Sequence, residues 1–88
     1  RPFAARVHFA LGYLAARGGD LRAAGKAFRR AAELAPRFAE ARLHLAAAQI
    51  GLGRRRAAQR TCRKLRALLG NSRPQLARKC AYLTRGTR

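Results

Sequence analysis

Residues 8–36 read HFALGYLAARGGDLRAAGKAFRRAAELAP, and this stretch decides the fold. Apolar residues recur at helical spacing on both sides of Gly18-Gly19-Asp20, and Pro36 follows the second run. Glycine and proline end helices, and an apolar residue at every third or fourth position marks a helix that buries one side. The stretch therefore predicts two amphipathic helices, over 4–17 and 21–34, joined by a tight turn.

Three residues indicate that these two helices pack closely. Gly12 and Ala24 are small enough to let the backbones approach, and Phe28 is expected to fill the space beside them. Asp20 stands where a helix begins, and its carboxylate is expected to accept a backbone N–H and to favour the positive end of the helix dipole.

The same residues resemble the tetratricopeptide repeat, a helix–turn–helix unit whose repeat length is about 34 residues. The positions that match the repeat are Leu11, Gly12, Gly19, Asp20, Ala24, Phe28, Ala31 and Pro36. His8 and Ala15 stand where the family usually has Trp and Tyr. The resemblance implies an all-α, right-handed solenoid of helix pairs.

A second unit with the same pattern lies one repeat length further along the chain, but it matches less completely. Gly53 and Ala58 repeat Gly19 and Ala24, and Cys62 stands at the position of Phe28. We predict one domain of five helices, over 4–17, 21–34, 38–52, 54–69 and 74–84. Its parts are repeat one (5–38), repeat two (39–72), a terminal helix (73–84) and a basic tail (85–88). Ser72-Arg73-Pro74-Gln75 predicts a capping box at the start of the last helix.

The charge is strongly one-sided, with 21 basic and 3 acidic residues among 88 and a net charge of +18. Residues 54–88 hold 12 basic and no acidic residues, against 9 basic and 3 acidic residues in 1–53. Charged helix faces are usually solvated, but solvated faces normally mix both signs, so these faces indicate contact with an external polyanion.

We therefore predict binding to nucleic acid, DNA or RNA, through phosphates and without sequence readout. The candidate residues are Arg6, Tyr13, Arg17, Arg22, Lys26, Arg29, Arg30, Arg54, Arg55, Arg56, Arg60, Arg63 and Lys64. On the first helix, Phe9 and Tyr13 either stack on bases or belong to the core.

The alternative function is a protein-interaction scaffold. The resemblance implies that the first helix of each pair lines a groove, here with Glu40, Leu43, His44, Ala47 and Gly51 on the third helix. The family's carboxylate clamp needs Lys and Asn in that groove, where this chain has apolar residues, so we expect an acidic or apolar partner segment instead.

Apolar residues at both ends of the predicted domain suggest self-association. Ala4, Val7, Leu11 and Leu14 form a stripe on the first helix, and Leu76, Ala77 and Leu83 are offered by the last helix. Two different apolar ends predict head-to-tail stacking into a homo-oligomer or filament on a polyanion.

No catalytic constellation, metal-ligand spacing, cofactor motif or membrane-spanning run is found, so a non-enzymatic protein is expected. Cys62 and Cys80 are either two buried thiols or a disulfide. A disulfide favours an extracellular or periplasmic location, and free thiols favour a cytoplasmic or organellar one. The chain begins at Arg1 without Met, so a processed product or a fragment is expected.

Overall fold

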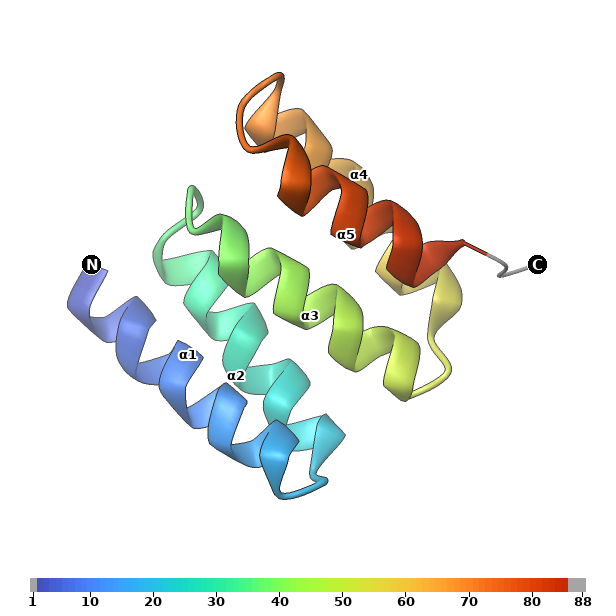
Figure 1. The fold of residues 1–88 in the computed structure, drawn as a ribbon. Helices are drawn as coiled ribbons and strands as arrows, with labels where there is room; N and C mark the ends of the chain where they lie inside the picture. Colours follow the sequence, from blue (N-terminus) through green and yellow to red (C-terminus); the bar gives the residue numbers. More distant parts are fainter. Residues whose placement is uncertain (1, 86–88) are drawn as a thin grey trace.

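Five α-helices and the turns between them account for the fold of residues 2–85, which are the residues that the computed structural model describes (Figure 1). The helices are α1 (Pro2–Arg17), α2 (Leu21–Leu34), α3 (Ala39–Gly51), α4 (Arg55–Leu69) and α5 (Pro74–Thr84). The predicted bounds of the second and fifth helices coincide with α2 and α5. The other helices differ from their predicted ranges by one or two residues at an end, where helices commonly fray.

Helix α3 lies at the centre of the arrangement. Consecutive helices pack on each other from α1 to α5, and α3 also contacts α5. Figure 1 shows α3 between α2 on one side and α5 on the other. This position explains why α3 is apolar almost all round, since it buries several sides at once. Its buried residues are Ala39, Ala41, Leu43, Leu45, Ala46, Ala48 and Gln49.

The same turn ends α1 and α3. Gly19 has φ +86°, its N–H donates to the Ala16 carbonyl at 3.0 Å, and Asp20 N–H donates to the Ala15 carbonyl at 2.9 Å. Gly53, one repeat length further on, has φ +78° and the equivalent bonds. This is the Schellman arrangement, which favours glycine because of the left-handed φ. The spacing found in the sequence is thus a structural repeat.

Aromatic rings hold the first repeat together. Phe28 is 1% exposed, and its ring lies 5.5 Å from that of Phe9 and 5.3 Å from that of His44. Phe9 also lies 5.0 Å from Phe38. A Cβ built on the buried Gly12 would come within 2.7 Å of the Phe28 ring, so glycine is needed for this close approach. Phe9 therefore packs in the core, the second of the two roles considered for it.

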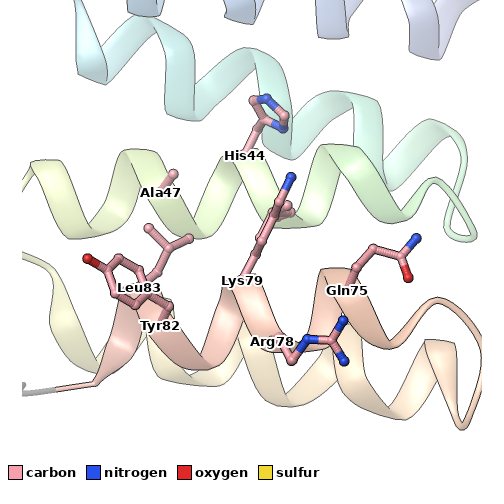
Figure 2. A pocket seen from close by; sticks show the side chains of 8 residues that line it. His44, Ala47, Gln75, Arg78, Lys79, Tyr82 and Leu83 are labelled. Carbon is pink, nitrogen blue, oxygen red and sulfur yellow. The ribbon is translucent and has the colours of Figure 1, made fainter.

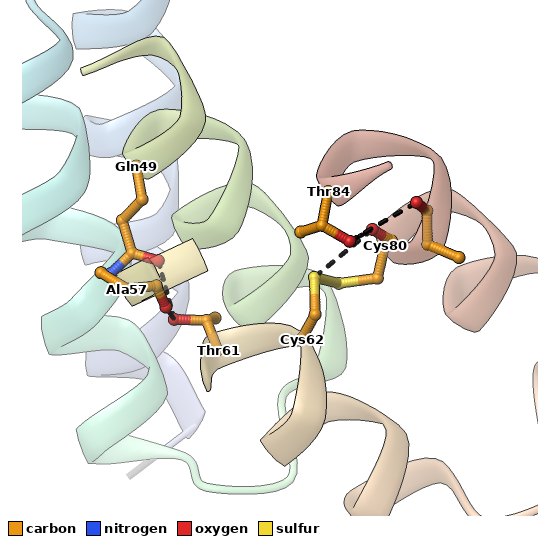
Figure 3. Close-up of a disulfide and its surroundings, with 7 residues drawn as sticks. Gln49, Ala57, Thr61, Cys62, Cys80 and Thr84 are labelled. Atoms are coloured by element: carbon orange, nitrogen blue, oxygen red, sulfur yellow. Dashed lines mark hydrogen bonds between the residues drawn. A yellow bond between two sulfur atoms is a disulfide. The ribbon is translucent and has the colours of Figure 1, made fainter. Parts of the chain in front are cut away.

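A disulfide holds the second repeat to the last helix. Cys62 of α4 and Cys80 of α5 are bonded to each other and buried, with their Cα atoms 5.6 Å apart (Figure 3). Around the disulfide lies an apolar cluster from α3, α4 and α5. Its buried members are Ala39, Leu43, Ala46, Ala58, Cys62, Leu65, Leu69, Leu76 and Cys80.

The prediction of a capping box at the start of α5 was wrong. The residue that precedes the helix is Arg73, with φ +48° and no side-chain cap, and Ser72 lies one position too early. The Ser72 hydroxyl instead donates to the Leu69 carbonyl at 2.7 Å, at the end of α4. Ser72 bonds to the end of the preceding helix because Gly70, with φ +57°, reverses the direction of the chain between them.

The prediction that Leu76 is offered at the outer end of the domain was also wrong. Leu76 is 5% exposed and packs with Ala77 and Leu83 against the disulfide cluster, because α5 must cover both α3 and α4. Helix α1 does expose the predicted Val7, Leu11 and Leu14, and Phe3 beside them. Leu76 is therefore not available as an apolar contact for head-to-tail stacking. Among residues 2–85, none of the helices has the length and apolarity needed to cross a bilayer.

Candidate binding groove

A groove of about 700 Å³ lies between α3 and α5 (Figure 2). We call it the α3–α5 groove. Its lining residues are Leu43, His44, Ala47, Gln75, Arg78, Lys79, Tyr82 and Leu83. Figure 2 shows Lys79 and Leu83 extending from α5 toward α3, where Ala47 and His44 lie. Because the side chain of Ala47 is small, it leaves space in the groove beside the middle of α3.

The groove combines apolar walls with cationic groups. Leu43, Ala47 and Leu83 provide the apolar surface, and Arg78 and Lys79 are exposed on α5. Among residues 2–85, no carboxylate side chain lines the groove. Such a surface suits a ligand that carries both apolar side chains and negative charge.

His44 is fixed by a hydrogen bond along its own helix. Its Nδ1 lies 2.9 Å from the Glu40 carbonyl oxygen, which can only accept, so Nδ1 carries the hydrogen. The ring edge also packs against Phe9, with 5.0 Å between the ring centroids. His44 therefore separates the aromatic core of repeat one from the α3–α5 groove.

An ion pair connects α3 to the segment that enters α5. The Arg73 guanidinium donates to the Glu40 carboxylate, and the two side chains are partly exposed. The hydrogen bond from Arg73 lowers the pKa of the Glu40 carboxyl from its ordinary value, and the same bond raises the pKa of Arg73. Together with the Cys62–Cys80 disulfide, this pair holds the α5 wall of the groove in place.

The predicted nucleic-acid residues of α1 do not line the α3–α5 groove. Tyr13 is 46% exposed, and the Arg17 guanidinium lies 5.8 Å from the centre of its ring. Arg6 is exposed and lies beside the turn between α2 and α3. These three residues belong to α1, whereas the lining of the groove comes from α3 and α5.

Other predicted nucleic-acid residues gather on the opposite side of α3. Arg22, Lys26 and Arg29 of α2 line hollows whose other wall is α4, with Arg54 and Lys64. Arg55, Arg56 and Arg60 lie together around the start of α4. Arg63 is exposed on α4, and Arg30 pairs with Glu33 at 3.5 Å. The structure thus brings together five of these residues, namely Arg22, Lys26, Arg29, Arg54 and Lys64, and it does not bring the others into the same hollows.

Four groove residues were missed by the sequence analysis, namely Gln75, Arg78, Lys79 and Tyr82 of α5. A signal for one of them was present, because Arg78 follows His44 by the same repeat length that relates Gly53 to Gly19. Extending the repeat register into the last helix would have placed Arg78 beside the groove.

Among residues 2–85 no three or more His, Cys, Asp or Glu side chains gather as a metal site.

The family model described as tetratricopeptide repeat matches residues 15–81, well over half of the chain. Comparisons with curated proteins and with solved structures find no match.

Proposed function

The chain belongs to the tetratricopeptide repeat family, and we propose that it is a protein-interaction scaffold. Repeats of this family typically act as non-enzymatic scaffolds. The proposed ligand is a partner segment that is both acidic and apolar, held in the α3–α5 groove.

The observation that carries the proposal is the chemistry of the groove. A volume of about 700 Å³ admits several side chains of a bound segment, and Leu43, Ala47 and Leu83 offer them apolar contact. Arg78 and Lys79 stand beside these residues without a carboxylate partner in the groove. An acidic segment would therefore gain both burial of its apolar side chains and attraction to the two cations.

A fluorescence anisotropy titration with a labelled peptide of alternating leucine and glutamate tests the proposal. We expect the Ala47→Gln variant to bind it at least about tenfold more weakly, because a longer polar side chain at the centre of the groove removes the apolar contact without adding a charge. Arg78→Ala with Lys79→Ala is expected to weaken binding and to reduce its dependence on salt.

The matched control is Lys26→Ala with Arg29→Ala, which removes the same charge from the far side of α3 and is expected to leave peptide binding unchanged. A peptide of alternating leucine and lysine controls for apolar attraction alone. If all variants bind the acidic peptide equally, or if the lysine peptide binds as well, the groove is not the binding site.

A further inference from the structure

A second hollow surface lies between α2 and α4, with α3 as its floor. We call it the α2–α4 cleft. It consists of two adjoining hollows, of about 410 and 270 Å³, which share Arg29 and Leu45. Leu45 and Gln49 come from the side of α3 opposite to Leu43 and Ala47, because two residues along a helix turn the side chain by about 200°. The α2–α4 cleft and the α3–α5 groove are therefore on different faces of the molecule.

Cations line both walls of this cleft. Arg22, Lys26 and Arg29 follow one another along α2 at intervals of about one turn, and Arg54 and Lys64 face them from α4. The ion pairs of residues 2–85 are Arg30–Glu33 and Arg73–Glu40, and neither involves these five cations. The Asp20 carboxylate at the edge of the cleft accepts the Ala23 N–H. The Glu33 carboxylate, which also lines the second hollow, pairs with Arg30. The five cations thus outnumber the two carboxylates of the cleft, and each of these carboxylates is already bound within the fold.

The start of α4 adds to this positive charge. Arg54, Arg55 and Arg56 lie at the positive end of the helix dipole, and neither an acidic residue in the first turn nor a side-chain cap compensates them. The Nε atom of Arg55 is buried and has no hydrogen-bond partner. This arrangement is electrostatically unfavourable for the isolated chain, and an anion along α4 would relieve it.

The floor of the cleft indicates which anion fits. Leu45 and Gln49 are buried, and the Thr61 hydroxyl donates to the Gln49 side-chain oxygen at 2.7 Å, so the exposed charges of the cleft belong to its walls and not to its floor. The two hollows, of about 410 and 270 Å³, have room for the backbone of one strand and are too small to admit a duplex.

From these observations we infer that the α2–α4 cleft binds the phosphate backbone of a single-stranded nucleic acid. The phosphates lie between the two walls and contact Arg22, Lys26 and Arg29 from one side and Arg54 and Lys64 from the other. Contacts to phosphates carry no sequence information, so binding in this cleft is expected to be independent of sequence. The inference is independent of the peptide proposed for the other face.

A salt titration with a fluorescein-labelled oligothymidine, read by anisotropy, tests the inference. For the wild-type chain the logarithm of affinity falls by about 0.7 per phosphate contact for each tenfold rise in salt. Lys26→Ala with Arg29→Ala is expected to lower that slope by about 1.4, because two contacts are lost. Arg54→Gln with Lys64→Gln, on the opposite wall, is expected to give the same loss.

The matched control is Arg78→Ala with Lys79→Ala, which has the same net charge and should keep the wild-type slope. Circular dichroism verifies that each variant is helical. Equal losses in the cleft variants and in the control would overturn the inference, because net charge alone would then explain binding. So would a duplex that binds as tightly as the single strand, or polyglutamate that displaces the strand at equal charge concentration.

Discussion

Helix α3 faces α1 on one side and α5 on the other, and both sides are built on the same repeat. Side chains fill the space toward α1, whereas a groove remains open toward α5. Toward α1, the rings of Phe9, Phe28 and His44 meet at centroid distances of 5.0–5.5 Å. Toward α5, Cys62 takes the position that Phe28 holds in the first repeat, and a groove of about 700 Å³ remains. The volume of the side chains at equivalent positions of the two repeats therefore decides whether the helices enclose a core or leave a binding surface open.

The two sides also differ in what stabilises them. Buried aromatic side chains remove about 150–250 Å² each from water, and Phe28 contributes such burial to the stability of repeat one. Repeat two lacks these rings, and the Cys62–Cys80 disulfide ties α5 to α4 in their place. A covalent bond needs little volume, and so it secures the wall of the groove without filling the groove.

The largest expected effect is that of Phe28→Ala. Phe28 is 1% exposed and contacts the other rings of repeat one, so its truncation should cost about 3–5 kcal/mol of unfolding free energy. Urea denaturation followed by circular dichroism measures the loss. A loss under about 1 kcal/mol would show that the aromatic cluster is not the main core of repeat one.

Reduction of the disulfide ranks second. Closing a loop between residues 62 and 80 is expected to contribute about 3 kcal/mol, so denaturation under reducing conditions should show that loss. Binding of the leucine–glutamate peptide should weaken with it, since α5 forms one wall of the groove. The Cys62→Ala, Cys80→Ala double variant serves as control, because reductant should not change its stability. An unchanged wild-type midpoint would contradict the role given to the bond.

The start of the second helix in each repeat offers a third test. The Asp20 carboxylate accepts the Ala23 N–H at 3.1 Å, whereas Arg54, at the same position of the second repeat, makes no such bond. Asp20→Ala should destabilise the fold by about 1 kcal/mol, and Arg54→Asp should stabilise it by a similar amount. Thermal unfolding of the two variants compares them. An Arg54→Asp chain less stable than wild type would show that arginine has a structural role there.

The smallest effect concerns the ion pair of Glu40 with Arg73. The pKa of the Glu40 carboxyl is lowered in the folded chain. The ion pair therefore stabilises the fold at pH values above the ordinary pKa of 4.5, and this stabilisation is lost as the pH falls below it. The stability difference between wild type and Glu40→Gln should therefore shrink between pH 6 and about pH 3. Since both side chains are partly exposed, added salt should also reduce it. A difference that is independent of pH would mean that the pair does not form in solution.

Local rules predicted much of the fold. Gly18-Gly19-Asp20 and Pro36 set the ends of α2, and the repeat spacing placed α3 and α4. The capping box failed because Ser72 can bond to either adjacent helix, and the position of Gly70 decides between them. Such choices depend on the path of the chain in three dimensions.

The groove was harder to predict than the helices. A groove is a difference between the volume that two helices enclose and the volume that side chains fill, and a helical pattern does not report that difference. The helical pattern placed Leu43, His44 and Ala47 on the correct side of α3, but it did not identify the α5 residues on the opposite wall. Which residues of α5 face α3 depends on the rotation of α5, which the contacts of Leu76 and Cys80 determine.

Nuclear magnetic resonance of the ¹⁵N-labelled chain titrated with the leucine–glutamate peptide tests the central claim most directly. The account predicts that the largest amide shifts occur at Ala47, Lys79 and Leu83, along the α3–α5 groove, while Phe9 and Phe28 in the filled half change little. Shifts concentrated along α1, or along the walls of the α2–α4 cleft, would contradict the assignment of the open half of the repeat as the peptide site.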